Sequence, residues 1–425
     1  MYRMYHEPGE RHCPLSYEEQ VDLALYDAIL NNDMTQVKYL TQHTKRDLNN
    51  CFLVVRHKKH EFNNPMRLVS SCGHALMLKF LIEAGCDVNK ISKRLRRTPV
   101  HMAVLGNNMS CLQLLIAARA KLDIRDVFGN SPCHYAAELG LHGMLDMMIR
   151  IGTQVNSQDI TAKTPLMKAV RNNKTESTLR LIRANADLNI ADNNNEVALH
   201  FAARNGSVET VDALISSGSL IDVQNLWGRS PLMEAVCYNN REVVQRLLAA
   251  GCDINKRECK SGDTALHIAV RRKYSKVVEL LLQYILLSPS YTLNMLTSYD
   301  WDIHKYLQFL EQEGQEKSLF FIAADGHCYK TCLLLASLGS IDQSARPILQ
   351  NRLENIDQTD SNHQNLTMLL EAMKTVIPLK HVCRNVIRKR LGVDLSRKIP
   401  ALPIPLVVKD YLLFKSKQES VAGSK

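Results

Sequence analysis

Residues 98–130 read TPVHMAVLGNNMSCLQLLIAARAKLDIRDVFGN, and variants of this stretch recur along the chain. An alanine stands five residues after the start of each later unit, and a pair of apolar residues stands seventeen to eighteen after it. Such a fixed period predicts stacked supersecondary units rather than one globular core. The units, 33 or 34 residues apart, begin at Asn64, Thr98, Ser131, Thr164, Val197, Ser230 and Thr264.

Each unit predicts a pair of helices followed by an extended finger. A proline after the opening Thr or Ser suits the first helical position, where its missing N–H is not needed. The alanine lets the first helix lie close to its neighbour, and the paired apolar residues of the second helix fill the layer between units. Left-handed helix caps are expected at Gly85, Gly152, Gly218 and Gly251, whereas Arg119 and Asn185 occupy the same place in two other units.

These features resemble ankyrin repeats. Residues 98–101 (TPVH), 131–134 (SPCH) and 264–267 (TALH) are similar to the family's Thr-Pro-Leu-His signature, whereas Met167 and Met233 replace the histidine in two units. The hydrogen bonding of those two turns therefore stays open. The resemblance implies an all-α chain with short finger turns, an ankyrin-repeat solenoid.

A second signature lies in residues 378–413, PLKHVCRNVIRKRLGVDLSRKIPALPIPLVVKDYLL. Its first half places an apolar stripe on a short basic helix, and its three prolines require an extended or turned segment. The Leu-x3-Cys-x3-Ile spacing resembles an elongin B/C binding box, and the following segment resembles a cullin-5 box. Together they look like a small helical SOCS box, although a C-terminal helix packed on its own domain is the alternative.

The SOCS-box resemblance implies two sets of contacts. Elongin B and elongin C are expected at Leu379, Cys383 and Ile387. Cullin-5 with its RING subunit is expected at Leu402, Pro403, Ile404 and Pro405. Internal packing of the box is the alternative role for these side chains.

The repeats and the box divide the chain into segments. Helical periodicity around an Asn31–Asp33 break suits an atypical capping repeat, and Ala323 and Gly339 recover the repeat phase after an interruption. We expect a capping repeat and basic connector at 1–63, ankyrin repeats at 64–287, an insertion at 288–317, a last degenerate repeat at 318–344, a helical linker at 345–377, the SOCS box at 378–414 and a tail at 415–425.

Composition restricts the classes of protein. The 425-residue chain shows no apolar run long enough to span a membrane and no secretory signal, so we expect a cytoplasmic protein that can also be nuclear. The 12 cysteines are dispersed, which favours reduced thiols, and His327, Cys328 and Cys332 are too few for a structural zinc site. The net charge of +10 attracts acidic surfaces, but no nucleic-acid motif accompanies it.

The repeats offer a candidate surface for a target protein. Cationic and aromatic side chains near the ends of the first helices, together with an aromatic finger residue, can bind an acidic or phosphorylated segment. A solvated basic face is an equally open interpretation, and Phe128 and Trp227 can instead pack against adjacent fingers. The candidate residues are Lys168, Arg171, Phe201, Arg204, Trp227, Tyr238, Arg271 and Arg272.

Signals for catalysis are weak. The histidines of the recurring turns repeat because the turn repeats, and no phosphate-binding loop or nucleophile with a recognisable setting is present, so no cofactor is expected. The resemblance implies a non-catalytic substrate adaptor of a cullin–RING ubiquitin ligase. An ankyrin scaffold without ligase function is the alternative. An enzyme using Cys328 and a nucleic-acid binder are more remote possibilities.

Overall fold

The computed structural model describes residues 17–44, 48–49 and 64–287 together with the single residues 323, 332, 349, 350, 367 and 370. Within these residues every long element is an α-helix and no strand occurs, which confirms the all-α class. The expected insertion, SOCS box and tail lie outside the described residues, as do the degenerate repeat and the linker apart from those single positions.

The chain divides into two compact units at Asn193, and each is described by itself. The N-terminal unit, residues 1–193, holds ten helices among its described residues. They are α1 (Tyr17–Leu30), α2 (Met34–His43), α3 (Pro65–Cys72), α4 (Ala75–Glu83), α5 (Pro99–Leu105), α6 (Met109–Ala117), α7 (Pro132–Leu139), α8 (His142–Ile151), α9 (Pro165–Arg171) and α10 (Thr175–Arg183).

The C-terminal unit, residues 194–425, holds six helices in the part that the structure describes. They are α11 (Ala198–Asn205), α12 (Val208–Ser216), α13 (Pro231–Cys237), α14 (Arg241–Ala249), α15 (Ala265–Arg271) and α16 (Ser275–Leu287).

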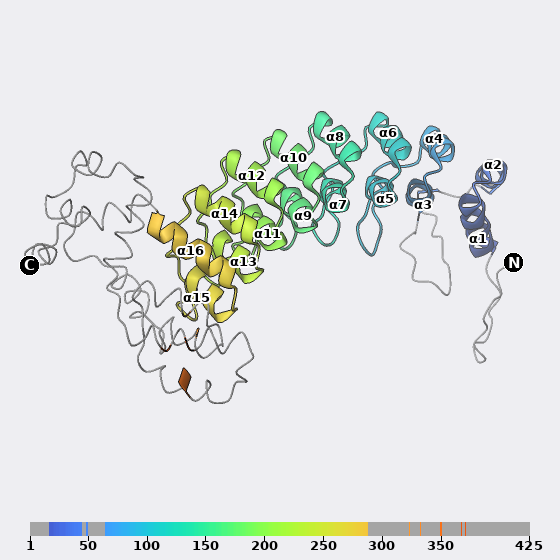
Figure 1. The fold of residues 1–425 in the computed structure, drawn as a ribbon. Helices are drawn as coiled ribbons and strands as arrows, with labels where there is room; N and C mark the ends of the chain where they lie inside the picture. Colours follow the sequence, from blue (N-terminus) through green and yellow to red (C-terminus); the bar gives the residue numbers. More distant parts are fainter. Residues whose placement is uncertain are drawn as a thin grey trace, which may run out of the picture. The chain divides into compact units, whose positions relative to one another are not determined.

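Within each unit the helices form two rows (Figure 1). From α3 onward, the first helix of every pair contacts the first helix of the next pair, in the orders α3–α5–α7–α9 and α11–α13–α15. The second helices make a parallel row, with contacts between α4 and α6, α8 and α10, α12 and α14, and α14 and α16. Each helix therefore packs mainly on its own partner and on its neighbours in the row.

The first helices begin where the sequence predicts. The side chains of Thr98 and Thr164 accept hydrogen bonds from the backbone N–H groups of residues three further on, and a proline follows each of them. Ala103 and Ala136, at the alanine position, have no exposed surface, which is how neighbouring first helices pack closely. Leu115 of the second-helix row is equally buried.

The second helices end in left-handed residues. Gly85 and Gly152 have φ values of 81° and 93°, as the spacing predicts. Arg119 and Asn185 adopt the same left-handed region, with φ values of 57° and 56°. The geometry of the cap is thus retained even where its residue is not glycine.

Candidate binding surface

Arg204 is the centre of a side-chain cluster in the C-terminal unit. Its Nε lies 3.1 Å from Oε2 of Glu234, and its Nη2 contacts Oε1 of Glu196. The guanidinium carbon lies 5.6 Å from the ring centre of Phe201 and 5.9 Å from that of Tyr238, both distances typical of cation–π contacts. Three candidate residues, Phe201, Arg204 and Tyr238, therefore come together.

The charge of Arg204 is largely used inside the protein. Glu196 and Glu234 are only 3% and 2% exposed, so their carboxylates need a nearby cation. Burial opposes the charged form of Arg204, but its hydrogen bonds to Glu234 and Glu196 outweigh this effect and raise its pKa. The cluster presents the exposed ring of Tyr238 more than it presents a free cation.

The remaining candidates of this unit differ in how far their charges are paired. Arg271 lies 2.9 Å from Oδ2 of Asp263, a buried carboxylate. Burial raises the pKa of Asp263, and Arg271 counteracts that rise. Arg272 is exposed, and its guanidinium has no hydrogen-bond or ion-pair partner among the described residues. Trp227 is exposed on the finger between α12 and α13.

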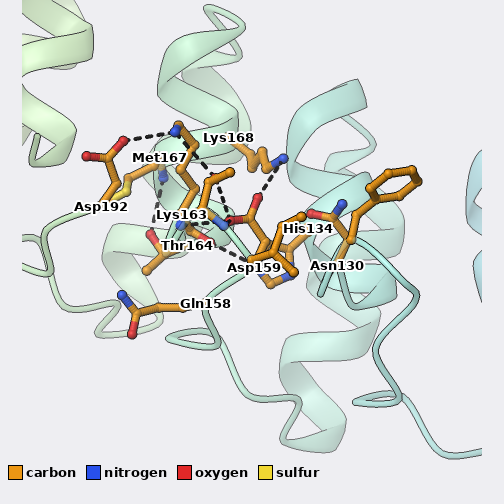
Figure 2. Close-up of polar contacts among 12 residues, drawn as sticks. Asn130, His134, Gln158, Asp159, Lys163, Thr164, Met167, Lys168 and Asp192 are labelled. Carbon is orange, nitrogen blue, oxygen red and sulfur yellow. Dashed lines mark hydrogen bonds and ion pairs between the residues drawn. The ribbon is translucent and has the colours of Figure 1, made fainter. Parts of the chain in front are cut away.

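In the N-terminal unit, Lys168 also pairs with a buried carboxylate. Its Nζ lies 3.0 Å from Oδ2 of Asp159, and Lys163 makes a similar pair with Asp192 at 2.9 Å (Figure 2). Burial disfavours the charged form of Asp159, but hydrogen bonds from Thr161, Lys163 and Lys168 outweigh it and lower its pKa. Arg171 at the end of α9 is exposed.

The histidines of the repeated turns have structural environments. The Nδ1 of His134 accepts the N–H of Ser131 at 3.1 Å, so its Nε2 carries the proton and donates to the carbonyl of Lys163 at 3.1 Å. Burial lowers the pKa of His134 to about 4, and the same cause acts on His101. These rings connect consecutive repeats, and their positions offer no exposed base.

The two methionine-containing turns retain part of this pattern. The N–H of Met167 still donates to the hydroxyl of Thr164 at 3.3 Å (Figure 2). The N–H of Met233 donates to the hydroxyl of Ser230 at 3.4 Å. A methionine side chain cannot replace the two hydrogen bonds of the imidazole. The helix start is therefore preserved, while the histidine link to the next repeat is lost.

Two protein-family models match this chain. The model described as "Ankyrin repeats (3 copies)" matches residues 65–159, 133–225 and 213–292, and the model described as "SOCS box" matches residues 375–413. The chain belongs to the ankyrin repeat and SOCS box protein family. Both are interaction domains without catalytic chemistry of their own.

Individual proteins similar to this ankyrin repeat and SOCS box protein align with less than half of its sequence. The nuclear factor NF-kappa-B p105 subunit of Gallus gallus is 29% identical over 205 residues, 47% of this chain and 14% of the relative. Ankyrin repeat domain-containing protein 37 of Bos taurus is 34% identical over 80 residues, 19% and 50% of the two chains. The human neurogenic locus notch homolog protein 1 is 40% identical over 79 residues, 18% and 3%. The chain spans half or less of the length of these curated relatives.

The residues proposed to hold elongin and cullin lie outside the described part of this ankyrin repeat and SOCS box protein. They are Leu379, Cys383, Ile387, Leu402, Pro403, Ile404 and Pro405. His327 and Cys328 also lie outside it, while Cys332 is buried. Among the described residues, no group of three or more His, Cys, Asp or Glu side chains can hold a metal ion. In that same part, no helix is both long and apolar enough to cross a bilayer.

The fingers of this family member also depend on acidic and amide residues that the sequence did not single out, because these side chains accept backbone N–H groups within the finger. Oδ1 of Asp126 accepts the N–H groups of Phe128 and Asn130 at 2.9 and 3.0 Å, and Asn225 does the same two and four residues on. A signal existed, because Asp126, Asp159, Asp192 and Asn225 recur at 33-residue spacing. The buried carboxylates that pair with arginine also show a sequence signal. Glu196 precedes Arg204 by eight residues, and Asp263 precedes Arg271 by the same number.

Proposed function

We propose that this chain is the substrate-recognition subunit of a cullin-5 RING E3 ubiquitin ligase. The observation that carries the proposal is the order of two matched domains, ankyrin repeats at 65–292 followed by a SOCS box at 375–413. The repeats hold the target and the box attaches it to the ligase. The chain itself is not an enzyme, because ubiquitin transfer occurs on the E2 enzyme and this protein contributes proximity.

The attachment is assigned to particular residues of the box. Leu379, Cys383 and Ile387 form the stripe that binds elongin B and elongin C. Burying one such aliphatic side chain contributes about 1.5–3 kcal/mol. The segment from Leu402 to Pro405 binds cullin-5 together with its RING subunit. The expected compartment is the cytoplasm.

Target binding is assigned to the repeats. Tyr238 and Arg272 are the strongest members of the candidate set in the C-terminal unit, because both are exposed and the Arg272 charge is not paired within the described residues. Arg204 makes cation–π contacts with the rings of both Tyr238 and Phe201. The other proposed target-binding residues are Lys168, Arg171, Trp227 and Arg271.

Co-purification tests the ligase assignment. The full chain is co-expressed with elongin B, elongin C and cullin-5, and we expect all three to be retained on the tagged chain. The double variant Leu379→Asp with Cys383→Asp should lose elongin and cullin together, because carboxylates cannot enter an apolar pocket. Ile404→Asp should retain elongin and lose cullin-5.

A matched control comes from the repeats. Leu76→Asp places the same charge on a side chain that is 80% exposed on α4, and it should leave both partners bound. Equal retention of elongin by the wild type and the Leu379/Cys383 variant would remove the mechanism and leave a scaffold. Retention of elongin with another cullin in place of cullin-5 would correct only the cullin assignment.

A further inference from the structure

Three finger loops of the N-terminal unit are joined edge to edge at their tips. The N–H of Val127 donates to the carbonyl of Leu95, and the N–H of Ile160 donates to the carbonyl of Phe128, both at 3.0 Å. Gly129 permits this approach, because its φ is +74° and a Cβ there would lie 2.7 Å from the backbone nitrogen of Ile160. We call the outer side of residues 92–97, 125–130 and 158–163 the fingertip surface.

The second and third loops of the fingertip surface carry exposed apolar side chains. Val127, Phe128 and Ile160 are 39%, 45% and 63% exposed, and they sit on consecutive joined loops. The loops are held from within, since the buried carboxylates of Asp126 and Asp159 each accept backbone N–H groups of their own loop. A preorganised apolar surface loses little conformational entropy when a partner binds.

The edge of the fingertip surface is basic. The first loop contains Lys93, Arg94 and Arg96, all exposed, and Arg125 of the second loop is exposed as well. The guanidinium groups of Arg94 and Arg96 have no hydrogen-bond or ion-pair partner among the described residues. Arg97 behaves differently, because it turns its Nε toward Oδ2 of Asp126 at 3.4 Å.

The acidic groups of these loops do not neutralise that edge. Asp126 and Asp159 are the only carboxylates in the three loops, and both are buried. Asp126 is engaged by Arg97, and Asp159 by Lys168 of α9. Arg94 and Arg96 are therefore left without a carboxylate partner among the described residues, in contrast to the paired Arg204 and Arg271 of the C-terminal unit.

We propose that the fingertip surface docks an extended protein segment in which acidic side chains alternate with aliphatic or aromatic ones. Arg94 and Arg96 bind the carboxylates, for which a guanidinium fork is well suited. Val127, Phe128 and Ile160 bind the apolar side chains. A polynucleotide is disfavoured, since two of these three side chains offer no ring on which a base can stack. Identifying that segment with the target rests on the proposed ligase function, whereas the docking itself does not.

Peptide selection on the full chain tests the proposal. A random-peptide library is selected on the wild-type chain, and the best peptides are synthesised with a fluorophore for titration. We expect them to combine Asp or Glu with Leu, Ile or Phe, and to bind more weakly as salt rises. Arg94→Glu with Arg96→Glu, and separately Phe128→Ala, should each weaken binding by about tenfold or more.

Two controls separate this surface from others. Leu76→Asp with Arg150→Glu changes one exposed apolar and one exposed basic residue on α4 and α8, and it should alter peptide affinity by less than about twofold. Arg183→Glu, at an exposed basic residue of α10, should also leave peptide affinity unchanged. Because every altered fingertip residue is exposed, the variants should unfold at the wild-type denaturant midpoint.

The outcomes that overturn the proposal are distinct. It is wrong if no peptide is enriched, if the enriched peptides lack acidic residues, or if they bind the fingertip variants as well as the wild type. It is also wrong if poly(U) RNA, titrated in parallel, binds in a fingertip-dependent way while the acidic peptides do not. Fingertip-dependent peptide binding by a chain that fails to hold elongin would preserve the surface and reject the ligase role.

Discussion

The buried histidines His101, His134 and His200 of the recurring turns each contact two consecutive repeats through their two ring nitrogens. The Nδ1 of His134 accepts a hydrogen bond from the N–H of Ser131 within its own repeat, and its Nε2 donates one to the carbonyl of Lys163 in the next repeat. The sequence identified this histidine as structural because it recurs with the turn. It could not reveal the carbonyl partner 29 residues away, because that contact exists only after the repeats stack.

Replacing His134 with methionine, as the chain itself does at residues 167 and 233, should destabilise the protein by about 1–2 kcal/mol at pH 7. The loss should shrink as the solution is acidified. Burial lowers the pKa of His134 from 6.5 to about 4, so between these values the unfolded state binds a proton that the folded state does not. Wild-type stability therefore falls with decreasing pH by at most about 1.4 kcal/mol per unit from this group, and the variant lacks that contribution.

Urea unfolding of both proteins between pH 7 and pH 4.5 measures this difference, and other acid-sensitive groups cancel in the comparison. The reverse change, Met233→His, is the matched control. In the next repeat, Asp263 holds the position that Lys163 holds after His134, so the new histidine can contact its carbonyl. It should stabilise the protein near pH 7 and add acid sensitivity. A stability difference that stays constant over this pH range would contradict the assigned pKa shift.

At the scale of the helix, the cap positions show how far a local pattern extends. The position that ends α4 and α8 with Gly85 and Gly152 was predictable from spacing, because a left-handed cap is a property of the chain within a few residues. The chain maintains that geometry at Arg119, where φ is 57°. A side chain with a Cβ is strained in this conformation, so α6 ends at a cost to stability.

Arg119→Gly should therefore stabilise the protein by about 0.5–1 kcal/mol, since relief of left-handed strain exceeds the added flexibility of the unfolded chain. The side chain of Arg119 is exposed, so little packing is lost. Gly152→Arg is the reverse substitution. No atom lies within 4 Å of a Cβ built at Gly152, so the arginine meets no steric clash and should destabilise the protein by a similar amount through backbone strain alone. If Arg119→Gly proves less stable in denaturant titrations, the strain is not the dominant contribution.

For the whole molecule, the 33-residue period was enough to predict the helix pairs, the helix starts and the exposed fingers, because these features repeat locally. It was not enough to predict which cations face solvent. Arg204 and Arg271 looked like members of a basic surface, but buried carboxylates of the fold pair with them. The sequence did not single out Arg94 and Arg96, although their guanidinium groups, like that of Arg272, have no hydrogen-bond or ion-pair partner among the described residues. Tertiary pairing redistributes charge in a way that a count of +10 cannot show.

Because each first helix contacts its neighbours in the row, a change at Arg204 should act locally. Arg204→Met removes the cation beside Glu196 and Glu234, which are nearly fully buried, and should cost about 2–4 kcal/mol. Hydrogen exchange should then quicken in α11 and α13, while α3 to α6 exchange at the wild-type rate.

Arg272→Met is the control for this experiment, since the exposed charge has no partner within the described residues and its loss should leave exchange unchanged throughout. Equal acceleration in α3–α6 and α11–α13 would instead show that the repeats open as one cooperative body. If opening is confined to α11 and α13, the fingertip surface keeps its shape when the C-terminal unit is altered. Loss of peptide binding in the fingertip variants can in that case be attributed to the substituted side chains themselves.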